Sequence, residues 1–319
     1  MHSNLSSYYF RNNYISSDIG FENTIFYENV KDYTNGTQNV LNCFSFDSEI
    51  MQHCVDNPQQ FNLFPTNEKF FTFFMTITTH CLYEYNSLLD KNYALVDAVA
   101  NSEIKDETFT LYNSLEPELK NTVREYYARA IDTELTLAYA INYLHENNLL
   151  DNTIIVLSGD HKASTNNILN YKKLYIEKVL NKPFQPYKNT VESFIYSKKI
   201  SNTYLESYNE SRKIDHLTEP VDLTPTILSL LGKNFNQEQC LGVPVINKSV
   251  INTTESVHSP LHHSFSFDKV ESINLSTYDG YDIISKNQNY QPTQNELNDF
   301  IKAYNQVFKR YYYVKDKRK

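Results

Sequence analysis

The feature that most constrains the fold of this chain is a short hydrophobic run that ends in a glycine, an aspartate and a histidine. Residues 153–158 (TIIVLS) are mostly β-branched or aliphatic, which predicts a strand buried on both faces. An amphipathic helix is predicted just before it, over residues 122–148, because apolar residues recur there at helical spacing. Those apolar positions are Ile131, Leu135, Ala138, Ile141 and Leu144. A helix, a short loop and a β-branched strand in this order are typical of a parallel α/β sheet.

Two further strands and two further helices are predicted around this unit. Residues 70–79 are a nearly continuous β-branched and aromatic run, and residues 191–197 are a shorter one. Residues 221–232 predict a helix in which Thr224 is the N-cap, Pro225 is the first helical residue and Gly232 ends the helix. Residues 294–312 predict a last amphipathic helix.

The charge and hydropathy of the chain narrow the classes of partner and location. A formal net charge of −9 argues against a nucleic-acid partner, because nucleic-acid phosphates bind basic surfaces. The sequence contains no apolar run of membrane-spanning length, and its first residues lack the charged-then-apolar pattern of a signal peptide. As written, the sequence predicts a chain with no anchor and no route out of the cytoplasm.

Two of the predicted strands end in residues that suit metal or phosphate chemistry. Strand 70–79 is followed by His80, and strand 153–158 is followed by Gly159, Asp160 and His161. Ligands of open parallel sheets bind beyond the carboxyl ends of the strands. An aspartate oxygen and an imidazole nitrogen are suitable ligands for a divalent ion. From the residues alone, a metal site at this edge and an ordinary structural role for the pair both remain open.

Three segments, in order and at similar spacing, resemble the lipoteichoic acid synthase and phosphoglycerol transferase family of the sulfatase (alkaline-phosphatase-like) superfamily. They are residues 149–161, residues 70–80 and residues 221–232. The resemblance implies that Asp160 and His161 bind the catalytic metal and that His80 contacts the substrate phosphate. It implies an α/β/α sandwich with a mainly parallel sheet, in one partial domain over residues 1–319. The resemblance itself covers about 1–245, and residues 246–319 are predicted to be a C-terminal extension.

The first residues carry a finer match to the same family. The family lines its glycerol-phosphate pocket with a histidine, an acidic residue two places on, an aromatic residue seven places on and an arginine nine places on. This chain has His2, Asn4, Tyr9 and Arg11 at those offsets. Arg11 is the expected phosphate clamp, because a planar guanidinium binds oxyanions through two hydrogen bonds. Asn4 replaces the family's aspartate and Tyr9 its tryptophan, so the match at these two positions is partial.

The resemblance implies metal-dependent transfer of glycerol phosphate from a phosphatidylglycerol-type lipid, with manganese as the metal. The partner would be the lipid head group or glycerol phosphate itself. Family members carry a nucleophilic threonine and membrane helices upstream of the His2 position, so this sequence predicts an N-terminally truncated chain in which no catalytic nucleophile is identified. Two alternatives remain open. One is a non-catalytic remnant, or half of a split protein that needs an upstream-encoded complementary chain, and the other is a sulfatase or phosphodiesterase-type hydrolase. The family is membrane-anchored with an extracytoplasmic catalytic domain.

Overall fold

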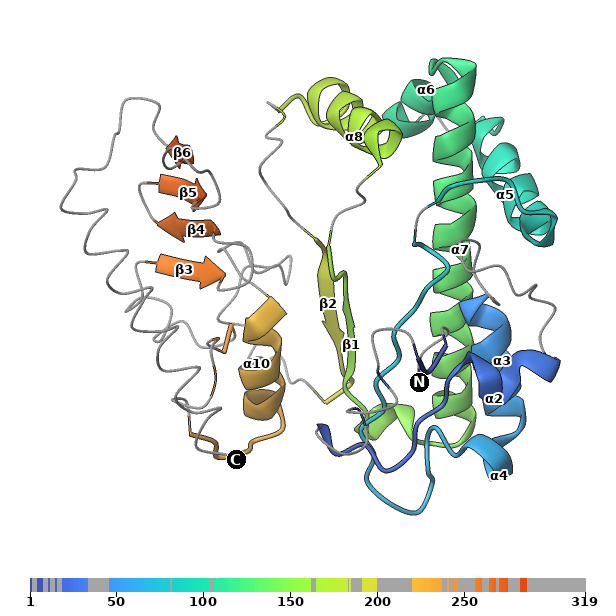
Figure 1. Cartoon of the computed structure of the whole chain (residues 1–319), viewed down its shortest axis with the longest axis vertical. Coiled ribbons are helices and arrows are strands. Elements are labelled where there is room, and N and C mark those ends of the chain that lie inside the picture. The colour runs from blue at the N-terminus through green and yellow to red at the C-terminus, as the bar shows by residue number, and fades with distance from the viewer. Residues whose placement is uncertain are drawn as a thin grey trace. The chain divides into compact units, whose positions relative to one another are not determined.

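The computed structural model divides the chain into two compact units, Met1–Lys198 and Lys199–Lys319, which are described separately (Figure 1). In the first unit it describes residues 1, 5–7, 11, 15, 19–33, 46–80, 82–103, 106–161, 165–182, 184 and 191–198. In the second unit it describes residues 199, 220–236, 240, 242, 244–245, 256–259, 264–267, 270–274 and 282–285. That the whole chain forms one domain stays a prediction.

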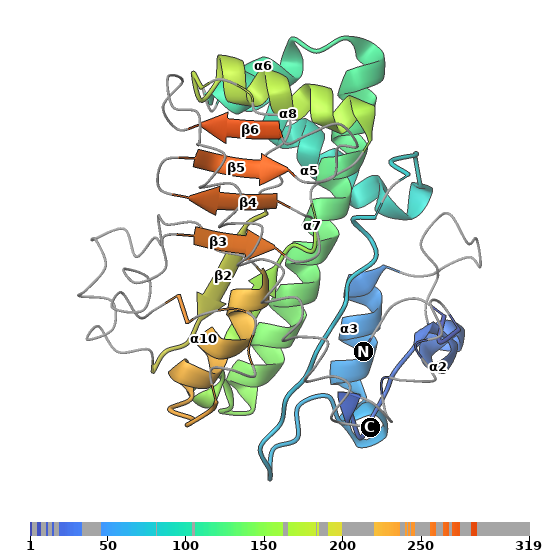
Figure 2. The same cartoon turned by 60° about the vertical axis from the view of Figure 1, so that its left-hand side comes forward.

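The first unit is built around one long helix, α7, which spans Pro117–Glu146. The helix begins with Pro117 at its first position, where the missing N–H costs no hydrogen bond. It ends at a pair of asparagines, of which Asn148 adopts a left-handed backbone with φ 56°. Helices α3, α5 and α8 pack against α7, as Figure 2 shows. The other helices of this unit, in chain order, are α2 (Tyr27–Val30), η3 (Lys31–Tyr33), α3 (Asp47–Asp56), α4 (Pro58–Phe61), η4 (Ser87–Leu89), α5 (Asp90–Ala100), α6 (Glu107–Asn113), η5 (Leu150–Asn152) and α8 (Asn166–Lys178).

Tyrosines fill much of the core between α5, α6, α7 and α8. Tyr93 and Tyr112 are each only 2% exposed, and the hydroxyls of Tyr127 on α7 and Tyr171 on α8 lie 2.7 Å apart. Burial raises the pKa of Tyr171 well above its usual range, with the hydrogen bond to Tyr127 adding to the rise. A tyrosine ring supplies a large apolar area, and the hydroxyls of Tyr93, Tyr127 and Tyr171 have polar partners, which helps a chain without tryptophan to fill this core.

The buried face of α7 agrees only in part with the face predicted by its apolar spacing. The predicted residues Leu135 and Ala138 are exposed. A stripe of polar side chains at the same helical spacing is buried instead, and we call it the polar stripe: Glu125, Arg129, Asp132 and Thr136. Leu144 is buried as predicted and Ile131 packs against the core, so the prediction was wrong only in part. It missed the polar stripe because it treated apolar residues as the buried ones, whereas these polar groups find hydrogen-bond partners inside the unit.

The predicted strands over 153–158 and 191–197 are present as β1 (Ile155–Ser158) and β2 (Ser193–Tyr196). The two strands pair antiparallel, with Ile155 opposite Tyr196 and Ser158 opposite Ser193. Within the described residues every strand pair is antiparallel, so the predicted parallel order is not found there. The expectation that β1 is buried on both faces was also wrong, because its last two residues are exposed.

Residues 70–80 form an extended segment rather than a strand, and only Met75 makes a bridge. The N–H of Met75 donates to the carbonyl of Met1 at 3.1 Å. Further along, the N–H groups of Ile77 and Thr78 donate to the carboxylate of Asp47 instead of to a neighbouring strand. A side chain therefore takes the donors that a sheet would have used.

The second unit contains the predicted helix over 221–232, shifted at its start. A 3₁₀ turn, η6 (Pro220–Asp222), leads into α10 (Leu223–Leu230), so the N-cap is Asp222 and not the predicted Thr224. Pro225 remains in the first turn, where helix N–H groups have no intrahelical partner. Gly232 ends the helix as predicted, with φ +64° and an N–H bond from Lys233 to the Leu228 carbonyl.

Asp222, Pro225 and Thr226 are all buried, in accord with a structural role for this segment. The hydroxyl of Thr226 donates to the carbonyl of Asp222 at 2.6 Å and accepts from the N–H of Val245 at 3.0 Å. The backbone of Gly242 passes so close that a Cβ there would lie 2.3 Å from the Val221 carbonyl oxygen. The backbone near residue 245 is thus fastened to the start of α10.

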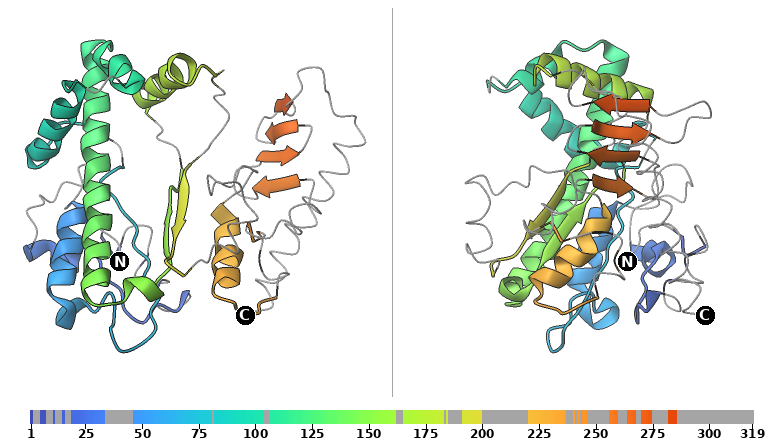
Figure 3. Two further views of the ribbon diagram at one scale, coloured as in Figure 1. Left: turned by 180° about the vertical axis from the view of Figure 1, so that it is seen from behind. Right: turned by 90° about the vertical axis from the view of Figure 1, so that its left-hand side faces the viewer.

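Four short strands complete the second unit as an antiparallel sheet in the order β3-β4-β5-β6 (Figure 3). They are β3 (Ser256–Ser259), β4 (Ser264–Phe267), β5 (Val270–Asn274) and β6 (Asp282–Ser285). The predicted helix over 294–312 lies outside the described residues. In the part of the chain that is described, no helix has the length and apolarity to cross a membrane.

Candidate functional site

His80 lies in a short turn at the end of the extended segment 70–80. Its N–H donates to the carbonyl of Ile77 at 2.9 Å, and its side chain is exposed. We call residues 78–84 the His80 loop, of which residue 81 lies outside the described residues. The loop leaves the extended segment at Thr78, which is fully buried. The exposed His80 therefore follows two residues after a buried position.

A buried pair fixes the start of the His80 loop. The carboxylate of Asp47, at the first position of α3, accepts the N–H groups of Ile77 at 2.8 Å and Thr78 at 2.7 Å. In return, the hydroxyl of Thr78 accepts the N–H of Asp47 at 3.0 Å. Asp47 and Thr78 are both 0% exposed. Charge-assisted bonds of this kind are about twice as strong as neutral ones, so α3 and the loop are firmly joined.

Asp132 of the polar stripe extends this pair to α7. Its carboxylate accepts the hydroxyl of Ser48 through a short hydrogen bond and the N–H of Ser48 at 3.5 Å, and it also accepts from Thr78. Burial raises the pKa of Asp132, and the hydrogen bonds from Ser48 and Thr78 partly offset the rise. Three segments distant in sequence thus meet at one buried carboxylate.

Arg129, also on the polar stripe, reaches both ends of the His80 loop. One terminal nitrogen donates to the carbonyl of Thr78 at 3.2 Å, and the other donates to the carbonyl of Glu84 at 3.1 Å. The residue is 1% exposed. Sequence reasoning missed the buried residues Arg129, Asp132, Asp47 and Thr78. The one signal that could have indicated a buried polar face on this helix was the helical spacing of the polar residues 125, 129, 132 and 136.

Asp160 and His161 directly follow β1, as predicted. The strand exits through Gly159, whose N–H donates to the Glu192 carbonyl at 3.2 Å and whose missing Cβ would lie 3.0 Å from the Cβ of Val191. The N–H of His161 donates to Oδ1 of Asp160 at 2.8 Å, and Nε2 of His161 lies 3.4 Å from Oδ2. Their side chains are 87% and 54% exposed, so an incoming cation reaches both.

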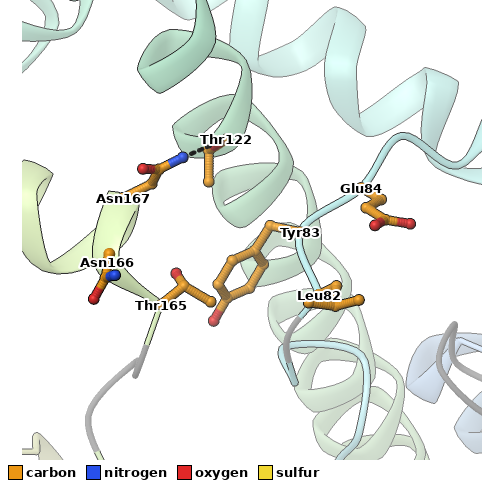
Figure 4. Close-up of a pocket in the computed structure, with 7 residues that line it drawn as sticks. All are labelled: Leu82, Tyr83, Glu84, Thr122, Thr165, Asn166 and Asn167. Atoms are coloured by element: carbon orange, nitrogen blue, oxygen red, sulfur yellow. Dashed lines mark hydrogen bonds between the residues drawn. The ribbon is translucent and has the colours of Figure 1, made fainter.

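A small open pocket lies between the segments that follow these two sites. It has a volume of about 300 Å³ and is lined by Leu82, Tyr83, Glu84, Thr122, Thr165, Asn166 and Asn167. Figure 4 shows Tyr83 and Thr165 facing one another, with the amide of Asn167 bonded to the hydroxyl of Thr122 at 3.3 Å. The chain just after His80 and the start of α8 therefore meet on α7, although His80, Asp160 and His161 do not themselves line the pocket.

The N-terminal site residues are described only in part. His2, Asn4 and Tyr9 lie outside the described residues, and Arg11 is half-buried. Two described residues near this N-terminal end contact the segment 70–80. The carbonyl of Met1 accepts the N–H of Met75, and the ring of Phe21 stacks on that of Phe71 with the centroids 5.7 Å apart. The N-terminal region thus contacts the extended segment that leads to His80.

The described residues contain no cluster of three or more histidine, cysteine, aspartate or glutamate side chains arranged to hold a metal. Asp160 and His161 supply two such groups, one oxygen and one nitrogen, at one exposed corner. Two ligands do not make a complete metal shell.

Comparison with solved structures shows a close likeness of fold. The crystal structure of the lipoteichoic acid synthase LtaP from Listeria monocytogenes aligns over 99% of this chain and 68% of its own, with a TM-score of 0.65 and 15% identity. The structure of Ps i-CgsB in complex with k-i-k-neocarrahexaose aligns over 73% of this chain and 54% of its own, at 14% identity, but its TM-score of 0.35 is too low to indicate a common fold.

Comparison at the level of sequence gives a family. None of the curated proteins shows significant similarity to this chain. The family model described as Sulfatase matches residues 2–233, which include the His80 loop, β1 with Asp160 and His161, and α10. The match covers well over half of the chain, and its α/β fold is that of LtaP. The chain therefore belongs to the sulfatase family.

Proposed function

We propose that this protein takes part in metal-dependent transfer of glycerol phosphate from a phosphatidylglycerol-type lipid. The observation that carries the proposal is the exposed Asp160–His161 pair at the end of β1, in a sulfatase-family chain whose fold resembles that of a lipoteichoic acid synthase. In the proposal these two side chains hold a metal ion and His80 binds a phosphate oxygen. The residues His2, Asn4, Tyr9 and Arg11 line the glycerol-phosphate pocket.

The donor types at Asp160 and His161 suit a divalent ion such as manganese. A carboxylate oxygen and an imidazole nitrogen are both borderline-to-hard ligands, and both side chains are open to solvent. Because the imidazole Nε2 already lies 3.4 Å from the carboxylate, little rearrangement brings the two donors onto one cation. When bound, the metal supplies a positive charge that stabilises developing charge on phosphate oxygens.

The chain's own residues bind and orient the phosphate in this proposal. The exposed imidazole of His80 donates a hydrogen bond to one phosphate oxygen, and the half-buried guanidinium of Arg11 binds two more. Holding the phosphate at several points lowers the entropy cost of reaction. His80 suits this role because its loop is fixed by buried hydrogen bonds while its side chain stays open.

Binding measurements on the purified chain test this proposal. In calorimetry with Mn²⁺ and glycerol 1-phosphate, we expect binding of both ligands. Asp160→Ala should weaken Mn²⁺ binding by at least about tenfold, because it removes one of the proposed ligands. His80→Ala should weaken the binding of glycerol phosphate by about 10- to 100-fold, because it removes one hydrogen bond to a charged group.

Asp151→Ala is the matched control. Asp151 is an exposed aspartate just before β1, paired with Lys198 at 2.7 Å, so its loss changes net charge without touching the site. We expect the Asp151 variant to bind as the unmodified chain does. Equal weakening by Asp151→Ala and Asp160→Ala would show that Mn²⁺ binds the acidic surface in general, and would contradict the proposal.

Membership of the sulfatase family also favours a second candidate, hydrolysis of a sulfate ester. The two functions differ in substrate. Release of diacylglycerol from a fluorescent phosphatidylglycerol, with the glycerol phosphate attached to an added acceptor, supports transfer. Turnover of 4-nitrophenyl sulfate without lipid turnover supports a sulfatase.

A further inference from the structure

We propose that Arg129 is a positioning residue that sets the shape of the His80 loop and thereby the place of the His80 imidazole. The inference rests on the proposed role of His80 in phosphate binding. The observation behind it is that one buried guanidinium donates to the carbonyls at both ends of the loop, Thr78 and Glu84.

Other contacts hold the start of this loop or join residues within it. Asp47 binds the N–H of Thr78, at the start of the loop. Tyr83, near the end, donates its hydroxyl to the carbonyl of Thr79 at 3.2 Å and packs edge-on against Tyr126 of α7 at 5.5 Å. Arg129 connects the carbonyls of residues 78 and 84, the two ends of the loop.

The chemistry of the guanidinium makes this a geometric constraint and not only an attraction. Its nitrogens lie in one rigid plane, so the two carbonyls are held at a fixed separation and orientation. Burial at 1% exposure removes competing water and raises the cost of leaving the charge without its carbonyl partners. An apolar residue of similar volume would fill this place in the core without the cost of desolvating a charge. The two carbonyl bonds of Arg129 offset part of that desolvation cost.

The position of Arg129 on α7 links the loop to the rest of the buried network. Asp132 lies one turn further along the same face and binds Ser48 and Thr78. The helix therefore forms hydrogen bonds with the loop through two polar side chains, Asp132 at its start and Arg129 at both ends. Because α7 is the longest helix of the unit, it provides a rigid reference against which His80 is placed.

Hydrogen–deuterium exchange on the ligand-free chain tests the positioning directly. Arg129→Met keeps the length of the aliphatic stem and removes both donors, so we expect amides of the His80 loop to exchange at least about tenfold faster, as for a local opening. Arg129→Lys keeps the charge but not the planar fork, and should give an intermediate rate. If Arg129→Met does not fold, Arg129→Lys decides the outcome by itself.

Arg124→Met is the matched control. Arg124 lies on the same helix, but its guanidinium makes a two-point ion pair with Asp97 of α5 and lies over the ring of Tyr93, so it is engaged with α5. Its variant should leave exchange in the His80 loop unchanged. Unchanged exchange in both Arg129 variants, or faster exchange spread equally over α3, α5 and α7, would overturn the inference.

A double-mutant cycle then asks whether Arg129 acts through His80. The affinity for glycerol 1-phosphate should fall by about 3- to 30-fold in Arg129→Lys, because a misplaced His80 keeps only part of its hydrogen bond to the charged phosphate. In the His80→Ala background the same change should have no further effect. An equal loss in both backgrounds would indicate a general structural role and contradict positioning. If the unmodified chain binds no glycerol phosphate, the proposed function fails, and the exchange rates alone decide whether Arg129 holds the loop.

Discussion

Replacing Thr78 by valine should show how much the buried junction of α3, α7 and the His80 loop contributes to stability. Valine has nearly the same shape, so the change removes one hydroxyl and little else. That hydroxyl accepts the N–H of Asp47 at 3.0 Å and donates to Asp132, and the residue is 0% exposed. Leaving a buried donor unsatisfied costs about 1–3 kcal/mol, and the bond lost to a charged carboxylate adds about 1 kcal/mol.

The expected total is a loss of about 3 kcal/mol in the free energy of unfolding, or a fall of about 6–12 °C in Tm at the size of the first unit. Urea unfolding followed by circular dichroism measures it, with an unchanged m-value as the sign that only stability has changed. Thr79→Val is the control, because that half-buried side chain makes none of the hydrogen bonds of the buried junction described above. The free energy of unfolding of this variant should stay within about 0.5 kcal/mol of the unmodified chain. The reasoning is refuted if the two valine variants are equally stable.

Three further changes test other parts of the structure. The raised pKa of Asp132 means that the folded state holds its proton more tightly than the unfolded state, so the free energy of unfolding should fall as pH rises above the ordinary value of 3.8. Asp132→Asn should make that fall shallower in urea titrations across pH, and identical slopes would contradict the assignment. Gly242→Ala should destabilise the second unit by about 1–3 kcal/mol, because its Cβ would overlap the Val221 carbonyl, and Gly232→Ala by about 1–2 kcal/mol from left-handed strain alone. Thermal unfolding should therefore show a loss for both glycine variants, and no loss at Gly242 would refute the close approach.

The sulfatase-family assignment predicted from sequence is confirmed by the family match, and the predicted fold is confirmed by the likeness to the LtaP structure. The helix before β1, the strands β1 and β2 and the glycine end of α10 were also predicted correctly. These features depend on local periodicity and on single residues with special backbone needs, such as Gly232. Such signals are contained in a few neighbouring residues and need no tertiary information.

The features that were missed depend on partners distant in the sequence. Polar residues of α7 are buried because Asp132 binds Ser48 and Thr78, and Arg129 binds two carbonyls of the His80 loop. The segment 70–80 has the composition of a strand, but the carboxylate of Asp47 takes two of its N–H donors. Periodicity indicates which residues share a face, and it cannot indicate what that face meets.

The direction of strand pairing was missed for a similar reason. A helix between two strands favours a parallel pair, and α8 does lie between β1 and β2. The two strands are nevertheless antiparallel, with Val156 opposite Ile195. Nothing in the alternation of apolar residues specifies strand direction, which is set by how the connecting chain returns.

The most direct test of the account is whether one bound metal ion lies close to both predicted site segments, the one with His80 and the one with Asp160 and His161. In NMR spectra of the histidine rings, stoichiometric Mn²⁺ should broaden the signals of His161, a proposed ligand, and of His80, the proposed phosphate contact. Asp160→Ala should abolish both effects, whereas Asp151→Ala should preserve both. Broadening of His161 without His80, in the presence of glycerol 1-phosphate, would show that the two segments do not form one site and would contradict the account.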